Sequence, residues 1–228
     1  MLKAQDETRG LGLRPGDRQI VIGVLIVGAT VVAFPFHHQT LLLLAASTVN
    51  LLLFAGLALG SRDMKGAAGP ALLFGLSAAL VYPWIERALS SQVDVGQYLV
   101  ANQYVLNTPV YVLGLWAYAM TLCAFVYLRL VRSVLSVTGS GLAMALLATM
   151  VAVGVETVGN IVGLWASSPH PPVLGYVSLY IVLGYMAVFA FLPGLMRWPV
   201  AGGALCSTGV FFAWWVFDKA IRLMNGLV

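Results

Sequence analysis

The sequence predicts an all-α, polytopic integral membrane protein with seven transmembrane helices and a cytoplasmic amino terminus. Of its 228 residues, 61% are hydrophobic and only 9% are charged, whereas roughly a quarter of the residues in a soluble domain are charged. The hydrophobic residues also occur in runs of about 20, the length that crosses a hydrocarbon core about 30 Å thick. The predicted spans are residues 19–36, 40–60, 69–89, 108–130, 140–163, 173–195 and 199–221.

Short segments of turn-forming residues separate these runs and mark the ends of the predicted helices. They are Pro35 with His37 and His38, residues 61–69, Thr108-Pro109, Gly139-Ser140-Gly141, residues 169–172 and residues 197–199. Residues 1–18 are polar and of mixed charge, which is not the pattern of a cleaved secretory signal. The predicted organisation is therefore a cytoplasmic tail over residues 1–18 and one membrane domain over residues 19–222.

The distribution of Lys and Arg predicts the orientation, because positively charged loops stay on the cytoplasmic side. Seven crossings place nine of the twelve basic residues on the side of the amino terminus. The other side receives Arg87, Lys219 and Arg222. We therefore expect the amino terminus in the cytoplasm, the carboxyl terminus outside and the protein in the cell membrane. Because the basic residues are scattered between apolar runs, no nucleic-acid partner is expected.

The longest predicted loop, residues 90–107, joins the third and fourth spans. Its apolar residues alternate with amides, including Tyr98 and Tyr104 beside Gln97 and Gln103. This pattern fits a short amphipathic helix that lies in the membrane interface. Such a segment would cover the mouth of a cavity.

Three carboxylates fall within predicted spans, where an ionisable group is a functional hypothesis by default. Glu86, Glu156 and Asp218 lie in the outer halves of spans three, five and seven, so all three are expected near one cavity. Asn160 follows Glu156 by one helical turn, which places both on one helix face. The alternative interpretations are structural: solvation of Glu86 beside Arg87, an interfacial helix end at Asp218, and a structural hydrogen bond at Glu156.

Other chemistry is not indicated. The histidines His37, His38 and His170 fall in predicted outer loops, so neither a metal site nor a haem site is expected, and no cofactor is predicted. Cys123 and Cys206 lie inside apolar runs, where a thiol behaves as a small hydrophobe. A retinal Schiff base at Lys219 is not expected, because this lysine lies near the outer end of its span.

Two blocks of sequence resemble a known family. The first is Glu86, Gly96-Gln-Tyr98, Tyr104, Pro109 and Leu113-Gly-Leu-Trp116, and the second is residues 156–165 with Pro172, Gly175-Tyr176 and Leu183-Gly-Tyr185. Over residues 75–190 the chain resembles the integral-membrane carotenoid hydratases of bacterioruberin-type pathways and the related lycopene cyclases. It is also similar in plan to the seven-helix membrane terpene cyclases. The chain has Glu156 where that pattern has an aspartate.

The resemblance implies a cofactor-free acid/base enzyme that cyclises or hydrates a lipid-soluble terpenoid or carotenoid through a carbocation. A carboxylic acid in apolar surroundings favours its neutral form and can protonate a double bond. Glu156 is predicted as the acid, with Glu86 or Asp218 as its partner. Asn160 and Tyr98 are expected to orient the groups, and aromatic faces stabilise the cation. The predicted wall residues are Trp84, Trp165 and Tyr176.

Two alternatives belong to other classes. A small transporter or proton-coupled carrier would also use intramembrane acids, although its site is expected near the midplane of the bilayer. A scaffold subunit would need none of them. A flux assay in proteoliposomes separates the carrier from the enzyme, and full function of carboxylate variants would indicate the scaffold.

Overall fold

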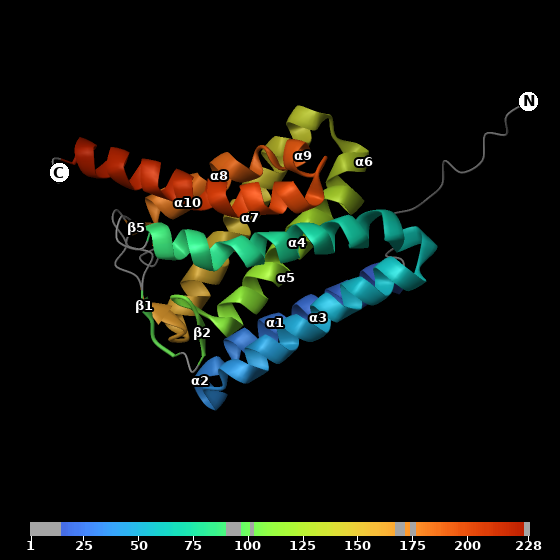
Figure 1. Ribbon diagram of the computed structural model, residues 1–228, viewed down its shortest axis with the longest axis horizontal. Helices are drawn as coiled ribbons and strands as arrows, with labels where there is room; N and C mark the ends of the chain where they lie inside the picture. The colour runs from blue at the N-terminus through green and yellow to red at the C-terminus, as the bar shows by residue number, and fades with distance from the viewer. Residues whose placement is uncertain (1–14, 90–96, 101–102, 167–171, 174–176, 226–228) are drawn as a thin grey trace, which may run out of the picture.

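The computed structural model describes residues 15–89, 97–100, 103–166, 172–173 and 177–225, and this part of the chain is 84% helical (Figure 1). The predicted all-α class is confirmed. The helices are α1 (Pro15–Val32), α2 (Phe34–His37), α3 (Thr40–Gly60), α4 (Arg62–Leu89), α5 (Val110–Val126), the π-helical turn η1 (Tyr127–Val131), α6 (Arg132–Val134), α7 (Val137–Ile161), α8 (Leu179–Phe189), α9 (Leu192–Leu195) and α10 (Pro199–Met224). The two-residue strands are β1 (Gln97–Tyr98), β2 (Tyr104–Val105), β3 (Thr108–Pro109), β4 (Trp165–Ala166), β5 (Pro172–Val173) and β6 (Val177–Ser178).

Within the described residues, five helices are long and apolar enough to cross a membrane, so the chain is a multi-pass membrane protein. These segments are Thr40–Gly60, Met64–Leu89, Val110–Val131, Val137–Ile161 and Pro199–Met224. The prediction of one continuous helix over residues 173–195 is wrong. Val177 and Ser178 are extended, and α8 ends at Phe189 before a new turn of helix begins at Leu192. Pro193 has no N–H to bond the carbonyl four residues earlier, which accounts for the interruption.

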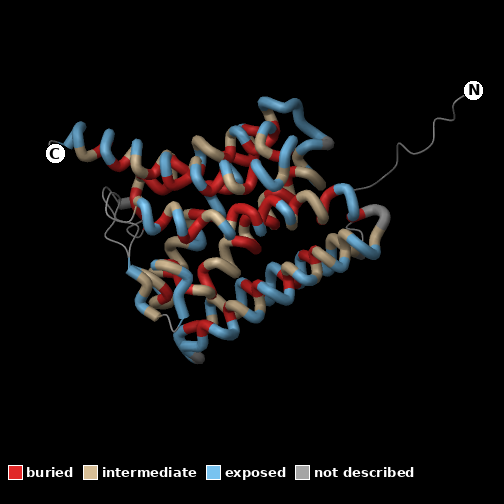
Figure 2. The backbone as a smooth tube through the Cα atoms, in the orientation of Figure 1, coloured by how far each residue is buried: buried red, intermediate tan, exposed pale blue. Residues whose placement is uncertain are grey.

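The outer surface of the bundle is apolar, as a bilayer requires. Leu25, Leu52, Leu80 and Met150 are 66%, 65%, 74% and 72% exposed, respectively. Figure 2 shows exposed residues along the length of the helices. A soluble protein rarely exposes apolar surface so extensively, so lipid is the medium that this surface fits.

The core forms around α4, which packs against α3, α5 and α10. Small residues permit this contact: a Cβ added at Gly75 would collide with the Ala117 carbonyl of α5, and one at Gly203 of α10 would collide with the Phe74 carbonyl. In a membrane such close helix approach supplies packing energy that the hydrophobic effect does not. Helix α8 packs against α7 and α10, and α1 packs against α3.

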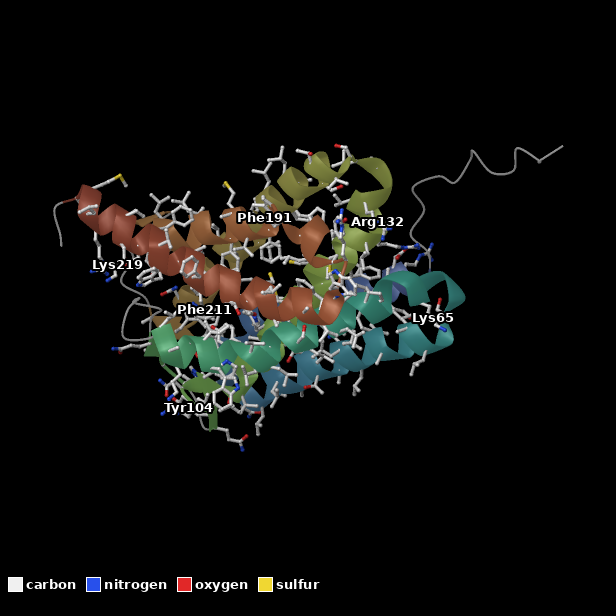
Figure 3. All side chains as sticks on the ribbon, turned by 45° about the horizontal axis from the view of Figure 1, so that its top comes forward. Lys65, Tyr104, Arg132, Phe191, Phe211 and Lys219 are labelled. Atoms are coloured by element: carbon white, nitrogen blue, oxygen red, sulfur yellow. The ribbon has the colours of Figure 1, made fainter. Side chains whose placement is uncertain are left out.

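The bundle has two distinct ends. Lys65 and Arg132 lie at one end, and Tyr104 and Lys219 lie at the other (Figure 3). Strands β1, β2 and β5 gather where α10 finishes (Figure 1), and we call this the strand end. At the opposite end, Asp17 of α1 accepts hydrogen bonds from Arg129 Nε at 3.1 Å and Nη2 at 3.2 Å. This ion pair ties the start of α1 to η1.

The described residues of segment 90–107 form short strands and not the predicted interfacial helix. β2 pairs antiparallel with β3, with Leu106 at φ 55° in the turn between them. β1 pairs with β4, which follows α7, in the register Tyr98 opposite Trp165. The described residues of this connection therefore form short paired strands, which need an extended backbone, instead of a helix.

Candidate functional site

A cavity with a volume of about 130 Å³ lies between α4, α5, α7, α8 and α10 near the strand end. Most of its wall is aliphatic or aromatic, and Glu156 is the one carboxylate among the described residues that line it. The polar and aromatic lining residues are Tyr82, Tyr98, Trp116, Glu156, Trp165, Tyr185 and Trp214. An apolar pocket with a few polar groups is typical of a binding site for a small organic molecule.

Glu156 comes from the last two turns of α7 and faces Trp165 of β4. Helix α7 ends at Ile161, and Gly163 adopts a φ of 77°, which turns the chain back toward the helix. Leu164 N then donates to the Gly159 carbonyl at 2.9 Å. The Trp165 indole nitrogen is buried near the Glu156 side chain and has no hydrogen-bond acceptor among the described residues. An indole donor is therefore available beside Glu156.

Gly159 makes room for this indole. Because a Cβ at position 159 would overlap the Trp165 ring, we expect Gly159→Ala to lower the free energy of unfolding by about 1–3 kcal/mol. Thermal unfolding of the full chain in detergent measures this loss. The control is Gly154→Ala on the same helix, where a Cβ meets open space and helix propensity favours alanine by roughly 1 kcal/mol. Equal effects of the two changes would contradict the tight fit.

Glu86, in the last turn of α4, forms a second polar group beside the cavity. It is 2% exposed, and its two carboxylate oxygens accept hydrogen bonds from the hydroxyls of Tyr98 and Thr108. The hydroxyl of Tyr82 lies 3.4 Å from that of Tyr98. Because the Tyr98 proton is directed to Glu86, Tyr82 is the donor to Tyr98. The chain Tyr82, Tyr98, Glu86 thus connects the cavity wall to a buried acid.

Tyr98 is held in place by strand pairing. β1 lies against β4, and Leu99 N donates to the Leu164 carbonyl at 3.2 Å. Burial raises the pKa of the Tyr98 phenol well above its ordinary value, and the neighbouring Glu86 carboxylate adds to this effect. Tyr98 therefore stays protonated near neutral pH and remains a donor.

Aromatic rings from α4, α5, α8 and α10 form much of the cavity wall. The ring centroids of Tyr82 and Trp116 are 4.9 Å apart, and those of Tyr185 and Trp214 are 5.5 Å apart. Phe211, in the bundle interior (Figure 3), lies 5.0 Å from Tyr82 and 4.8 Å from Trp214. Hydrogen bonds orient the two indoles: Trp116 donates to Ser207 Oγ at 2.9 Å and Trp214 donates to the Ile181 carbonyl at 3.3 Å. Such π-faces attract a positive charge.

Comparison of the chain with protein-family models, with curated proteins and with solved structures gave no match. The resemblance to carotenoid hydratases and lycopene cyclases therefore stays a prediction that depends on the residue pattern.

The structure brings some predicted site residues together and separates others. Glu156, Tyr98 and Trp165 line the cavity, and Glu86 bonds to Tyr98. The side-chain amide of Asn160 donates from Nδ2 to the backbone carbonyl of Glu156 at 2.9 Å, one helical turn earlier, so Asn160 lies on the face of α7 predicted for it.

Two predicted residues lie away from the cavity, and a third falls outside the described residues. Asp218 is 2% exposed, and both of its oxygens accept from Arg222 Nε at 2.9 Å, one helical turn along α10. The expectation that three acids share one cavity is therefore wrong, because this ion pair holds the Asp218 carboxylate on its own helix. Trp84 is 65% exposed and does not line the cavity. Tyr176 lies outside the described residues.

Sequence reasoning missed Tyr82, Thr108, Tyr185 and Trp214 as site residues. Tyr82 precedes Glu86 by four positions, so helical spacing alone places them on one face. Thr108 was assigned only to a turn, although a hydroxyl at a helix boundary is a ready donor. Tyr185 belongs to the second block of the family resemblance but was not predicted as a site residue, and nothing in the sequence distinguishes Trp214 from the many other aromatic residues. Among the described residues, no three His, Cys, Asp or Glu side chains form a group that could hold a metal ion.

Proposed function

We propose that this protein is a cofactor-free acid/base enzyme that cyclises or hydrates a terpenoid or carotenoid hydrocarbon inside the membrane. The observation that carries the proposal is the cavity itself, with one carboxyl group in an apolar and aromatic enclosure. A hydrocarbon has no charge and no hydrogen-bonding group, so an apolar cavity is suited to bind it. The carboxyl group in the wall can then transfer a proton to a double bond of that hydrocarbon. The reaction class is that of an isomerase or a lyase.

In the proposed mechanism, neutral Glu156 gives its proton to one carbon of a double bond, and the π electrons form the new C–H bond. The neighbouring carbon becomes a carbocation, and the faces of Tyr82, Trp116, Tyr185 and Trp214 stabilise it. Attack by a second double bond closes a ring, or attack by water forms an alcohol. A proton then leaves from the adjacent carbon or from the bound water.

The Tyr98 and Glu86 pair is suited to take up that proton. The Tyr98 oxygen can accept a proton while its own passes to Glu86, which its hydroxyl already contacts. Alternatively, the Glu156 carboxylate recovers the proton directly. The direct route restores Glu156 at once. After the route through Tyr98, Glu86 must release its proton to water and Glu156 must take one up from water before the next turnover.

We also propose that α1 and the α8–α9 pair complete seven crossings, with the amino terminus in the cytoplasm and the protein in the cell membrane. Support comes from the ion pair of Asp17 with Arg129 and from the position of Lys65 and Arg132 at the same end (Figure 3). Cationic residues near that end fit the positive-inside rule.

Turnover in D₂O tests the function. Membranes that contain the full chain are incubated with linear polyprenyl and carotenoid hydrocarbons, and the extracted lipids are compared by mass spectrometry. We expect a cyclised or hydrated product that carries carbon-bound deuterium, because the first step adds a solvent-exchanged proton to carbon. Membranes with the Glu156→Gln variant are the control. A product without deuterium, a requirement for an added cofactor, or no product from any of these hydrocarbons would contradict the proposal.

A further inference from the structure

The two helices that form the long walls of the cavity, α5 and α7, are joined at their ends. At the strand end, Tyr111 of α5 donates to the Leu164 carbonyl, which follows α7, at 3.2 Å. At the opposite end, η1 packs against α7. Between these points α5 packs against α3 and α4, whereas α7 packs against α8. The two helices therefore diverge where the cavity lies.

Apolar residues border this divergence. Ala119 and Cys123 of α5 are partly exposed, and Val151 and Val155 of α7 are 44% and 50% exposed, yet all four line the cavity. Since these residues line the cavity and are also partly exposed, they border the place where the cavity approaches the outer surface of the bundle. We call these four residues the side window. The side window lies on the apolar outer surface of the helices, where lipid surrounds the protein.

The strand end of the cavity has a different wall. Tyr98 and Trp165 line the cavity from paired strands, and the fully buried Leu164 accepts hydrogen bonds from Leu99 N and Tyr111. These contacts close the described part of this wall, so the apolar side window is the opening that suits a hydrocarbon.

The volume of the cavity limits what enters it. At about 130 Å³ it is close to the roughly 150 Å³ cavity that accepts benzene, and it is smaller than the about 300–1,000 Å³ of pockets for drug-sized ligands. It therefore holds a group of about five or six carbons. A longer chain must leave its remainder outside.

We propose that one end of an apolar chain enters laterally from the bilayer through the side window and stops beside Glu156, while the rest of the chain stays in the lipid between α5 and α7. This inference rests on the proposed function, since it specifies how that substrate reaches the acid. It makes the enzyme selective for the end group and tolerant of chain length.

Photo-crosslinking in phosphatidylcholine vesicles tests the route with the full chain. Two geranylgeranyl hydrocarbon probes carry a diazirine, one in the terminal isoprene unit and the other at mid-chain. We expect the terminal diazirine to label cavity residues such as Glu156 and the buried Tyr185, and the mid-chain diazirine to label the exposed faces of α5 and α7. Labels from both probes at the same surface positions, with none in the cavity, would overturn the proposal.

A matched pair of variants identifies the window itself. Val151→Trp places a bulky ring in the side window, and Met150→Trp places the same ring on the adjacent, 72% exposed position that does not line the cavity. We expect Val151→Trp to abolish labelling of the cavity by the terminal probe, and Met150→Trp to preserve it. Undiminished cavity labelling in folded Val151→Trp would refute lateral entry. Labelling as expected without any deuterated product would instead refute the proposed function and leave the entry route standing.

Discussion

Glu156→Gln is expected to lower turnover by about 10²- to 10⁴-fold, the usual contribution of a general acid. Glutamine has nearly the same size and keeps the side chain against Trp165, but it has no carboxyl proton to give. Because Glu156 is the one carboxylate among the described residues lining the cavity, no neighbouring acid replaces it. The rate of product formation in membranes, normalised to the amount of folded protein, measures the effect.

Two further variants make this result specific. Glu156→Asp keeps an acid on a shorter side chain, so it should retain part of the activity that Glu156→Gln loses. Asp218→Asn tests the role predicted for Asp218 from the sequence. Since Asp218 is paired with Arg222 outside the cavity, we expect a much smaller loss of turnover. If Asp218→Asn lowered turnover as much as Glu156→Gln does, Asp218 would be a catalytic residue. If Glu156→Gln kept full turnover, Glu156 would not be one.

Glu86→Gln is expected to have the second largest effect, on both stability and turnover. An amide offers one acceptor oxygen where Glu86 offers two, so either Tyr98 or Thr108 faces an NH₂ group that cannot accept its proton. A buried hydroxyl left unsatisfied costs about 1–3 kcal/mol. We expect a loss of unfolding free energy of this size and a fall in turnover of about 10²-fold, since the proton acceptor is also lost.

Tyr98→Phe separates these two roles. It removes the link between Tyr82 and Glu86 but leaves the Glu86 carboxyl group in place. Tyr104→Phe is the matched control, because Tyr104 lies in the same connection but is 53% exposed. Turnover should fall in Tyr98→Phe and stay unchanged in Tyr104→Phe. Equal turnover in the two variants would show that the hydrogen-bonded chain does not take part in the reaction.

Much of the fold could be predicted from the sequence. The span 40–60 agrees with α3 at both ends, since a run of apolar residues of the right length can satisfy its backbone in lipid only as a helix. The sixth span was less well predicted, because hydropathy does not detect the interruption at residues 190–191. The pairing of β1 with β4 was missed because it joins segments that are distant in the chain: β1 precedes α5 and β4 follows α7. The other strands pair locally but are only two residues long, too short to show a periodic pattern.

Only part of the candidate site could be predicted from the sequence. An acid in an apolar helix is rare and costly, so Glu86 and Glu156 could be selected from the sequence. The hydrogen-bond partners of these two acids could not be predicted from the sequence, because the Tyr98 hydroxyl reaches Glu86 only after β1 pairs with β4.

The sequence by itself determined that lipid surrounds this protein, that its backbone is helical, and that its intramembrane acids lie toward one end. Composition and periodicity decide these properties, since they depend on local transfer energies and on backbone hydrogen bonding within each segment. Only the tertiary structure decided that Glu156 faces a cavity, that Glu86 is bonded to Tyr98 and Thr108, and that Asp218 is held by Arg222. These outcomes depend on the direction of individual side chains and on contacts between distant segments, which no local pattern encodes.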